Sequence, residues 1–207
     1  SWQTDHDWIF PGHQAMPGTR MPPSQVLPFP SRSRPALPPV SDAALSAPRA
    51  AASDGSVLVV ADAGNNRVLV YRTIPTANGQ AADVVLGQAS MTTSGANSGG
   101  AGAGLSNPMG VAVSGGRLYV ADTGNHRVLI WNSIPMTSGQ AADVVLGQGD
   151  LTGTSANRGQ AAPRADTLRS PSAVLVDADS LYVSDAGNSR VLRWNSAVPA
   201  SGQGADG

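Results

Sequence analysis

The sequence predicts an all-β protein, because one strand–turn–strand pattern occurs three times within its 207 residues. In each copy, two runs of β-branched, aromatic and aliphatic residues flank a turn of the form Asp-x-Gly-Asn. Asp and Asn hydrogen-bond their own backbone in turns, so each pattern is interpreted as two strands joined by a turn. The copies are Leu58–Tyr71, Leu118–Trp131 and Leu181–Trp194. Their turn aspartates are 60 and then 63 residues apart, a period that indicates a repeat architecture.

The composition favours strands and turns over helices. Lys and Glu, two of the better helix formers, are absent, whereas there are 24 Gly and 16 Pro. The formal net charge of −1 does not indicate a surface that attracts nucleic acid. The absence of cysteine excludes disulfides and thiolate metal sites, and no apolar run is long enough to predict a membrane span. The sequence has no initiator Met and no signal peptide, which suits a mature or excised piece and leaves the compartment unknown.

Residues 1–44 are expected to form an irregular segment, because prolines crowd residues 11–39 and no hydrophobic period persists there. Within this segment, Gln25–Leu27 is either the remnant of an outer strand or a chance apolar pair. His6 and His13, with two Asp nearby, are interpreted as part of a solvated tail rather than as a metal site.

From residue 45 onward, each repeat has the order Leu-x-x-Pro, a short strand, a tight turn and two longer strands. The expected first strands are Ala50–Ser53, which is the weakest, Val111–Val113 and Val174–Val176. A fourth strand is expected at Asp83–Gln88 and at Asp143–Gln148. The third repeat reaches Gly207 before the corresponding Val-Val-Leu-Gly-Gln run, so its outer strand is missing. The predicted repeats are residues 45–104, 105–167 and 168–207.

The strands are apolar on both faces, with Leu118 and Val120 on one side of a strand and Tyr119 and Ala121 on the other. Such a sheet needs a neighbour on each side, and a radial stack of four-stranded blades, a β-propeller, provides it. A one-sided meander would instead show polar alternation. Three blades make a partial ring with open edges. We favour a fragment of a larger ring; the alternatives are an edge covered by another chain, or a missing strand supplied by Gln25–Leu27. Self-association through the open edges is also expected.

The segment Pro108–Val128, which contains Leu-Tyr-Val-Ala-Asp-Thr-Gly-Asn-His-Arg-Val, resembles the NHL repeat. The resemblance extends over three copies between residues 45 and 195, although Arg49–Ala51 departs from the pattern at the first strand of the first copy. It implies an interaction scaffold. We expect a non-enzymatic module that binds a protein or a glycan or other polymer and has no cofactor or metal. The long blades resemble those of bacterial NHL-repeat proteins, which implies an exported protein.

The turns carry opposite charges five residues apart, which a hairpin brings together, and we interpret them as structural pairs. The pairs are Asp62 with Arg67, Asp122 with Arg127, and Asp185 with Arg190. These turns and the long Gly-, Ser- and Thr-rich loops fall at the same end of a blade, so they are expected to build a ligand-binding face. The residue before each Arg differs between copies; it either reads a ligand or reflects tolerated variation at an exposed turn. These positions are Asn66, His126 and Ser189.

Gly124 is predicted to adopt a positive φ, where a side chain would be strained. One repeat position carries a large aromatic residue in every copy, and we predict that it packs between blades rather than binding carbohydrate. The residues are Tyr71, Trp131 and Trp194.

Two alternative functions stay open. A metal-dependent propeller enzyme of the lyase or lactonase kind would need inward-pointing His, Glu or Asp, which the predicted first strands lack. Asp177 and Asp179 are interpreted as a polar turn rather than as a cation site. An RNA-binding NHL propeller would need a basic face, whereas each turn Arg is balanced by an Asp.

Overall fold

The computed structural model describes residues 39–100 and 102–207, which belong to one compact unit. The predictions made for residues 1–38, which include Gln25–Leu27 and the two histidines, lie outside the described residues. No helix in the described part of the chain has the length and apolar character that crossing a bilayer requires.

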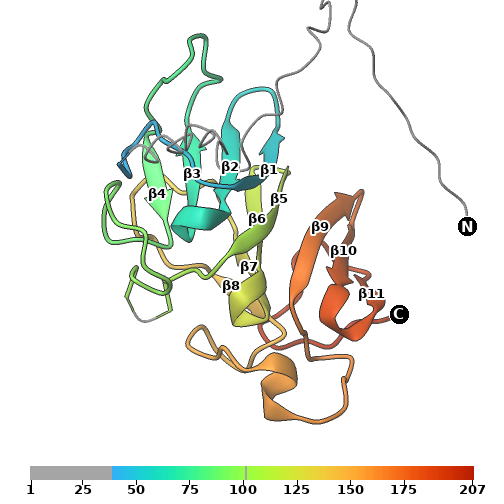
Figure 1. The fold of residues 1–207 in the computed structure, drawn as a ribbon. Coiled ribbons are helices and arrows are strands. Elements are labelled where there is room, and N and C mark those ends of the chain that lie inside the picture. Colours follow the sequence, from blue (N-terminus) through green and yellow to red (C-terminus); the bar gives the residue numbers. More distant parts are fainter. Residues whose placement is uncertain (1–38, 101) are drawn as a thin grey trace, which may run out of the picture. The chain divides into compact units, whose positions relative to one another are not determined.

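In the described residues, eleven strands form three antiparallel sheets, and each sheet is a meander in which consecutive strands are neighbours (Figure 1). We name the sheets blades 1, 2 and 3. Blade 1 contains β1 (Pro48–Ser53), β2 (Leu58–Asp62), β3 (Arg67–Tyr71) and β4 (Val84–Leu86). Blade 2 contains β5 (Pro108–Ser114), β6 (Arg117–Asp122), β7 (Arg127–Trp131) and β8 (Val144–Leu146). Blade 3 contains β9 (Pro171–Asp177), β10 (Ser180–Asp185) and β11 (Arg190–Trp194).

The register is the same in all three blades. Short 3₁₀ turns join the second and third strands, at η1 (Ala63–Asn65), η2 (Thr123–Asn125) and η4 (Ala186–Asn188). A further turn, η3 (Ala156–Gly159), lies in the loop between blades 2 and 3. Each turn places its Asp directly opposite its Arg, as in the pairing of Asp122 with Arg127. Although the first repeat has Ala51 where the second has Val111, β1 forms and Ala51 pairs with Val60.

Blade 3 has three strands within the described residues, and the pairing of a fourth begins at its edge. The Asp206 N–H donates to the Arg193 carbonyl at 2.8 Å. The same bond joins Asp143 to Ile130 at 2.9 Å in blade 2, where β8 follows. Blade 3 therefore matches the prediction of a blade without its outer strand.

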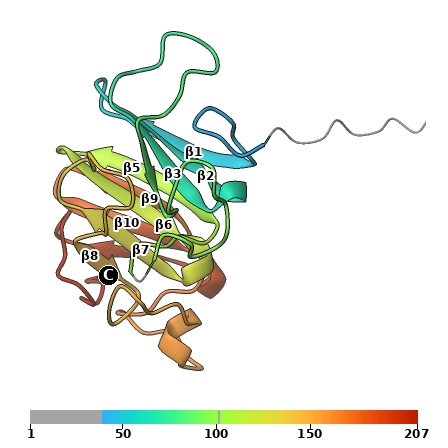
Figure 2. The ribbon, with the colours of Figure 1, turned by 90° about the vertical axis from the view of Figure 1, so that its left-hand side faces the viewer.

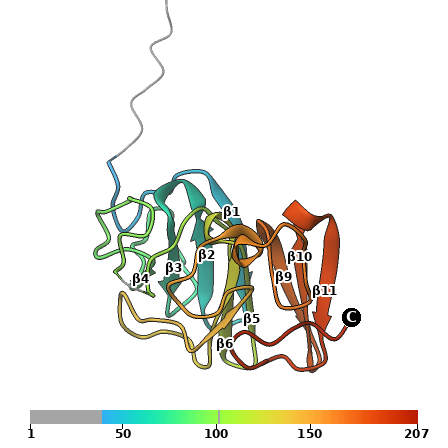
Figure 3. The same cartoon turned by 90° about the horizontal axis from the view of Figure 1, so that it is seen from below.

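The blades lie side by side as a partial ring, with blade 2 in the middle (Figures 2 and 3). The first strands are neighbours, since β5 contacts both β1 and β9. Blade 2 is buried on both faces: Val120 and Leu129 belong to the cluster shared with blade 1, whereas Tyr119 and Val128 belong to the cluster shared with blade 3. This arrangement is the one expected of stacked propeller blades.

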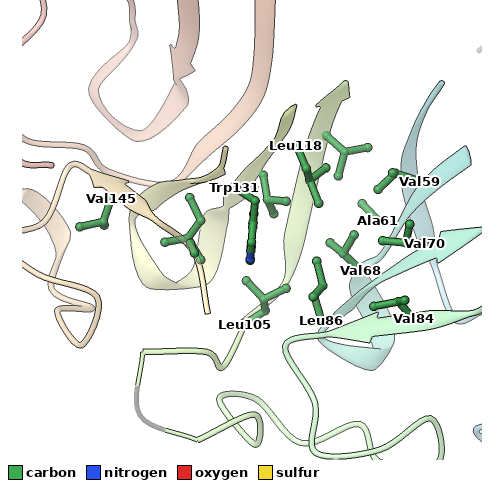
Figure 4. Close-up of a cluster of buried hydrophobic side chains, with 14 residues drawn as sticks. Val59, Ala61, Val68, Val70, Val84, Leu86, Leu105, Leu118, Trp131 and Val145 are labelled. Carbon is green, nitrogen blue, oxygen red and sulfur yellow. The ribbon is translucent and has the colours of Figure 1, made fainter. Parts of the chain in front are cut away.

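The aromatic residues occupy these interfaces. Trp131 lies among blade 1 and blade 2 side chains and is 1% exposed (Figure 4). Trp194 packs in the same way between blades 2 and 3. The indole N–H of Trp131 donates to the Gln140 carbonyl, and that of Trp194 donates to the Gln203 carbonyl. The prediction of packing between blades is therefore correct for the two tryptophans. Tyr71 is buried in a cluster formed by described residues of its own repeat.

Candidate functional site

The Asp-x-Gly-Asn turns and the long loops between blades meet at one end of the blades, as the repeat pattern predicts. The Asn66 side-chain amide donates to the Ser94 carbonyl at 2.9 Å, and Arg67 donates to the Met91 carbonyl at 2.6 Å. We call this end the loop face. It consists of the turn segments 62–67, 122–127 and 185–190 and the loops at residues 87–100, 102–107 and 147–170.

A buried ion pair anchors each turn. Arg127 Nε lies 2.7 Å from Asp122 Oδ2, and the two side chains are 2% and 0% exposed. Asp122 also accepts the Ser106 N–H at 2.8 Å and the Asn125 amide at 2.8 Å. Burial raises the pKa of Asp122, while the Arg127 charge and these hydrogen bonds oppose the rise. The carboxylate is thus held by a charge and two neutral donors.

Blades 1 and 3 repeat this arrangement. Arg67 and Asp62 are fully buried at 2.7 Å, and Arg190 lies 2.7 Å from Asp185 while remaining 25% exposed. The predicted structural pairs are therefore the ones that the structure brings together.

Each turn Arg also holds loops. Arg127 donates from one terminal nitrogen to the Gly104 carbonyl at 2.7 Å and from the other to the Leu151 carbonyl. Gly104 precedes blade 2 and Leu151 follows it. One guanidinium therefore fixes the incoming loop, the outgoing loop and the turn between them, and its charge is already balanced inside the protein.

The turn glycine differs from its prediction. Gly124 lies within η2 and does not have a positive φ; the left-handed residue is His126, at φ 56°. Glycine is required at position 124 because a Cβ there would approach the Ser106 carbonyl oxygen to 2.8 Å. The expectation of a positive φ at Gly124 was wrong, and close approach of two backbones is the reason for the residue.

The candidate ligand-reading positions Asn66, His126 and Ser189 all adopt the left-handed conformation. Asn66 Oδ1 accepts the Asn107 N–H at 2.8 Å, and His126 Nδ1 accepts the Ser170 N–H at 3.0 Å. These two side chains therefore contact the following blade. Ser189 is exposed. A role of these residues in reading a ligand stays a prediction.

Three further polar side chains support the loop face and were not singled out as site residues from the sequence. Gln148 donates to the His126 carbonyl at 3.1 Å and to the Ser155 carbonyl at 2.9 Å. Asn97 and Asn125 exchange reciprocal amide hydrogen bonds of 3.1 and 2.7 Å. Their sequence signal was recurrence, because a Gln lies two residues after each complete outer strand and an Asn recurs in each long loop.

A hollow of about 350 Å³ opens on the loop face between the two long loops. Its lining is largely glycine and hydroxyl groups, together with the anchored Arg127. The lining residues are Asn97, Gly100, Gly102, Gly104, Arg127, Leu151, Thr152 and Thr154. Across residues 39–100 and 102–207, no group of three or more His, Cys, Asp or Glu is placed to hold a metal ion.

The family model described as NHL repeat matches residues 105–131. Residues 105–131 are therefore identified as an NHL repeat. The matched segment runs from the Leu-x-x-Pro opening of blade 2 to the end of β7, and blades 1 and 3 repeat its strands, turn and ion pair. The all-β partial propeller predicted from the repeated strand pattern is confirmed.

Among solved structures, the chain is similar to the crystal structure of Myxococcus xanthus glutaminyl cyclase, with 15% sequence identity and a TM-score of 0.42. The match covers 76% of this chain and 50% of that one, so the chain spans about half the length of that protein. No curated protein sequence matches the chain.

Proposed function

We propose that this chain, which carries an NHL repeat at residues 105–131, is a non-enzymatic binding module that engages a protein or a glycan-like polymer through its loop face. The observation that carries the proposal is the hollow between the two long loops, because it is bounded by segments that Arg127 holds in place. Binding residues are commonly carried on loops that a rigid scaffold positions.

The lining of the hollow indicates the kind of contact it offers. Thr152 and Thr154 are exposed and present hydroxyl groups, and the glycine backbone leaves room for a ligand to approach. Arg127 already faces Asp122 and two carbonyls, so the hollow offers no free cation to a phosphate. A neutral, hydrogen-bonding surface of this kind suits a hydroxyl-rich polymer or a peptide backbone.

A screen against glycan arrays and a displayed peptide library tests the proposal, with each hit measured by calorimetry. Thr154→Trp fills the hollow and should weaken a genuine hit at least about tenfold, the equivalent of about 1.4 kcal/mol. Thr137→Trp is the matched control, because Thr137 is exposed in the loop that follows the far end of β7. Hits that bind the Thr154→Trp variant unchanged, or a screen without hits, would contradict the proposal.

A salt titration distinguishes nucleic acid from the proposed ligands. The affinity for nucleic acid would fall steeply as the salt concentration rises, because phosphate contacts release counterions. We also propose that the protein is bacterial and exported, as the resemblance of its long blades implies. Self-association through the open edge of blade 3 stays a prediction.

A further inference from the structure

The contact between blades 2 and 3 uses a titratable side chain where the contact between blades 1 and 2 uses an amide. In the first contact along the chain, Asn66 Oδ1 accepts the Asn107 N–H at 2.8 Å. In the second, His126 Nδ1 accepts the Ser170 N–H at 3.0 Å. The two acceptor residues are both left-handed, at φ 52° and 56°, and the two donors have φ of 46° and 48°. The two contacts therefore have the same backbone geometry and different acceptor groups. We call each of these hydrogen bonds, from a backbone N–H to the side chain of Asn66 or His126, a latch.

The latch requires a neutral imidazole. The Ser170 backbone N–H can only donate, so Nδ1 of His126 must offer a lone pair and the ring proton must be on Nε2. A protonated imidazole carries N–H groups on both nitrogens and cannot accept this bond. The Asn66 amide does not titrate, so its latch is indifferent to the same change in pH.

The charged groups around His126 come from both blades. Arg169, beside Ser170, opposes a positive charge on the ring, whereas Asp122 and Asp185 favour one. Both carboxylates are already paired with arginines of their own turns, Arg127 and Arg190. Burial is the largest influence and, together with Arg169, lowers the pKa of His126 below its usual value.

We propose that His126 makes the junction between blades 2 and 3 acid-sensitive, because protonation releases the N–H of Ser170, the residue immediately before β9. The sign follows from the lowered pKa. Above the unfolded-state value of about 6.5, His126 is neutral in both states and the latch is intact. As the pH falls below this value, the unfolded chain binds the proton more readily, so stability is lost until the folded-state pKa is passed. The junction between blades 1 and 2 does not share this loss.

Amide hydrogen exchange resolved at Ser170 and Asn107, corrected for intrinsic rates, tests the proposal between pH 7.5 and 5.0. In the wild-type chain, opening at Ser170 should rise roughly fivefold relative to Asn107, the ratio that corresponds to one net hydrogen bond of about 1 kcal/mol. His126→Asn copies the residue that blade 1 uses and should abolish this rise. Asn66→His should create a matching rise at Asn107. The other two histidines remain in all three proteins, so the differences isolate the latch.

An equal pH dependence of Ser170 exchange in the wild-type and His126→Asn chains would overturn the proposal. A wild-type NMR titration in which His126 has a pKa at or above about 6.5 would overturn it as well. This second measurement needs no variant, so the proposal stays falsifiable if a substitution prevents folding.

Discussion

Replacing Gly124 with alanine tests whether the turns are held by close backbone approach. The new Cβ would lie 2.4 Å from Ser106 Oγ and 2.8 Å from the Ser106 carbonyl oxygen. The hydroxyl can rotate away, but the carbonyl cannot, because it accepts the Gly124 N–H at 2.9 Å. The Ser106 N–H is itself bound to Asp122 at 2.8 Å. Relief of the clash must therefore stretch the turn against its own hydrogen bonds.

The expected cost follows from these contacts. Overpacking a tight site costs about 1–3 kcal/mol, and a weakened hydrogen bond adds about 1 kcal/mol, so Gly124→Ala should lower the free energy of unfolding by about 2–4 kcal/mol. For a domain of this size, that corresponds to a fall of about 5–15 °C in Tm.

Three other glycines provide matched controls in urea denaturation followed by circular dichroism. Gly149 has no positive φ and nothing within 4 Å of an added Cβ, so Gly149→Ala should be close to neutral. Gly139 has open space but a φ of +73°, so its alanine variant should cost about 1 kcal/mol. Gly147 combines a φ of +87° with a Cβ position 2.7 Å from Leu168. Gly147→Ala should therefore lower the free energy of unfolding the most.

The rank order of the four variants by loss of unfolding free energy tests whether close backbone approach selects glycine at position 124. If Gly124→Ala is no more harmful than Gly149→Ala, the approach of the Ser106 carbonyl does not select glycine at this position. If Gly124→Ala and Gly139→Ala cost the same, steric contact and backbone conformation cannot be separated in the way proposed.

Two further predictions compare equivalent residues in different blades. Arg127→Met should cost about 3–5 kcal/mol in thermal or urea unfolding, because it leaves Asp122 as an unpaired buried charge. Arg190→Met should cost less, because Arg190 is 25% exposed and water reaches its pair; equal losses would refute this reasoning. Val128→Thr should cost about 1–3 kcal/mol, since it buries a hydroxyl between blades 2 and 3. Val191→Thr, at the equivalent position of blade 3, should change stability by less than about 0.5 kcal/mol, because Val191 is 64% exposed.

The sequence predicted the strands, their order and the turn ion pairs, because these follow from local chemistry repeated three times. Alternation and turn residues act between neighbours along the chain, and a hairpin has only one register that places Asp122 opposite Arg127. The prediction failed at Gly124, because the reason for a glycine there is the Ser106 carbonyl, which reaches it from outside the hairpin.

The latch residues show the same limit at the candidate site. Asn66 and His126 differ in type, so their variation suggested ligand reading. What they share is a side-chain atom that accepts a hydrogen bond from the next blade. This shared role cannot be found by comparing residue types along the sequence.

The sequence by itself determined the repeat, the all-β blades and the need for a neighbour on each apolar face, since these depend on side chains close together in the chain. The tertiary structure alone decided which face of each blade is covered and how one arginine joins two loops. It also decided that Val128 is buried while Val191, in the same repeat position, is 64% exposed. The physical reason is that burial and hydrogen-bond partners between blades belong to pairs of distant segments, and their geometry exists only once the blades stack.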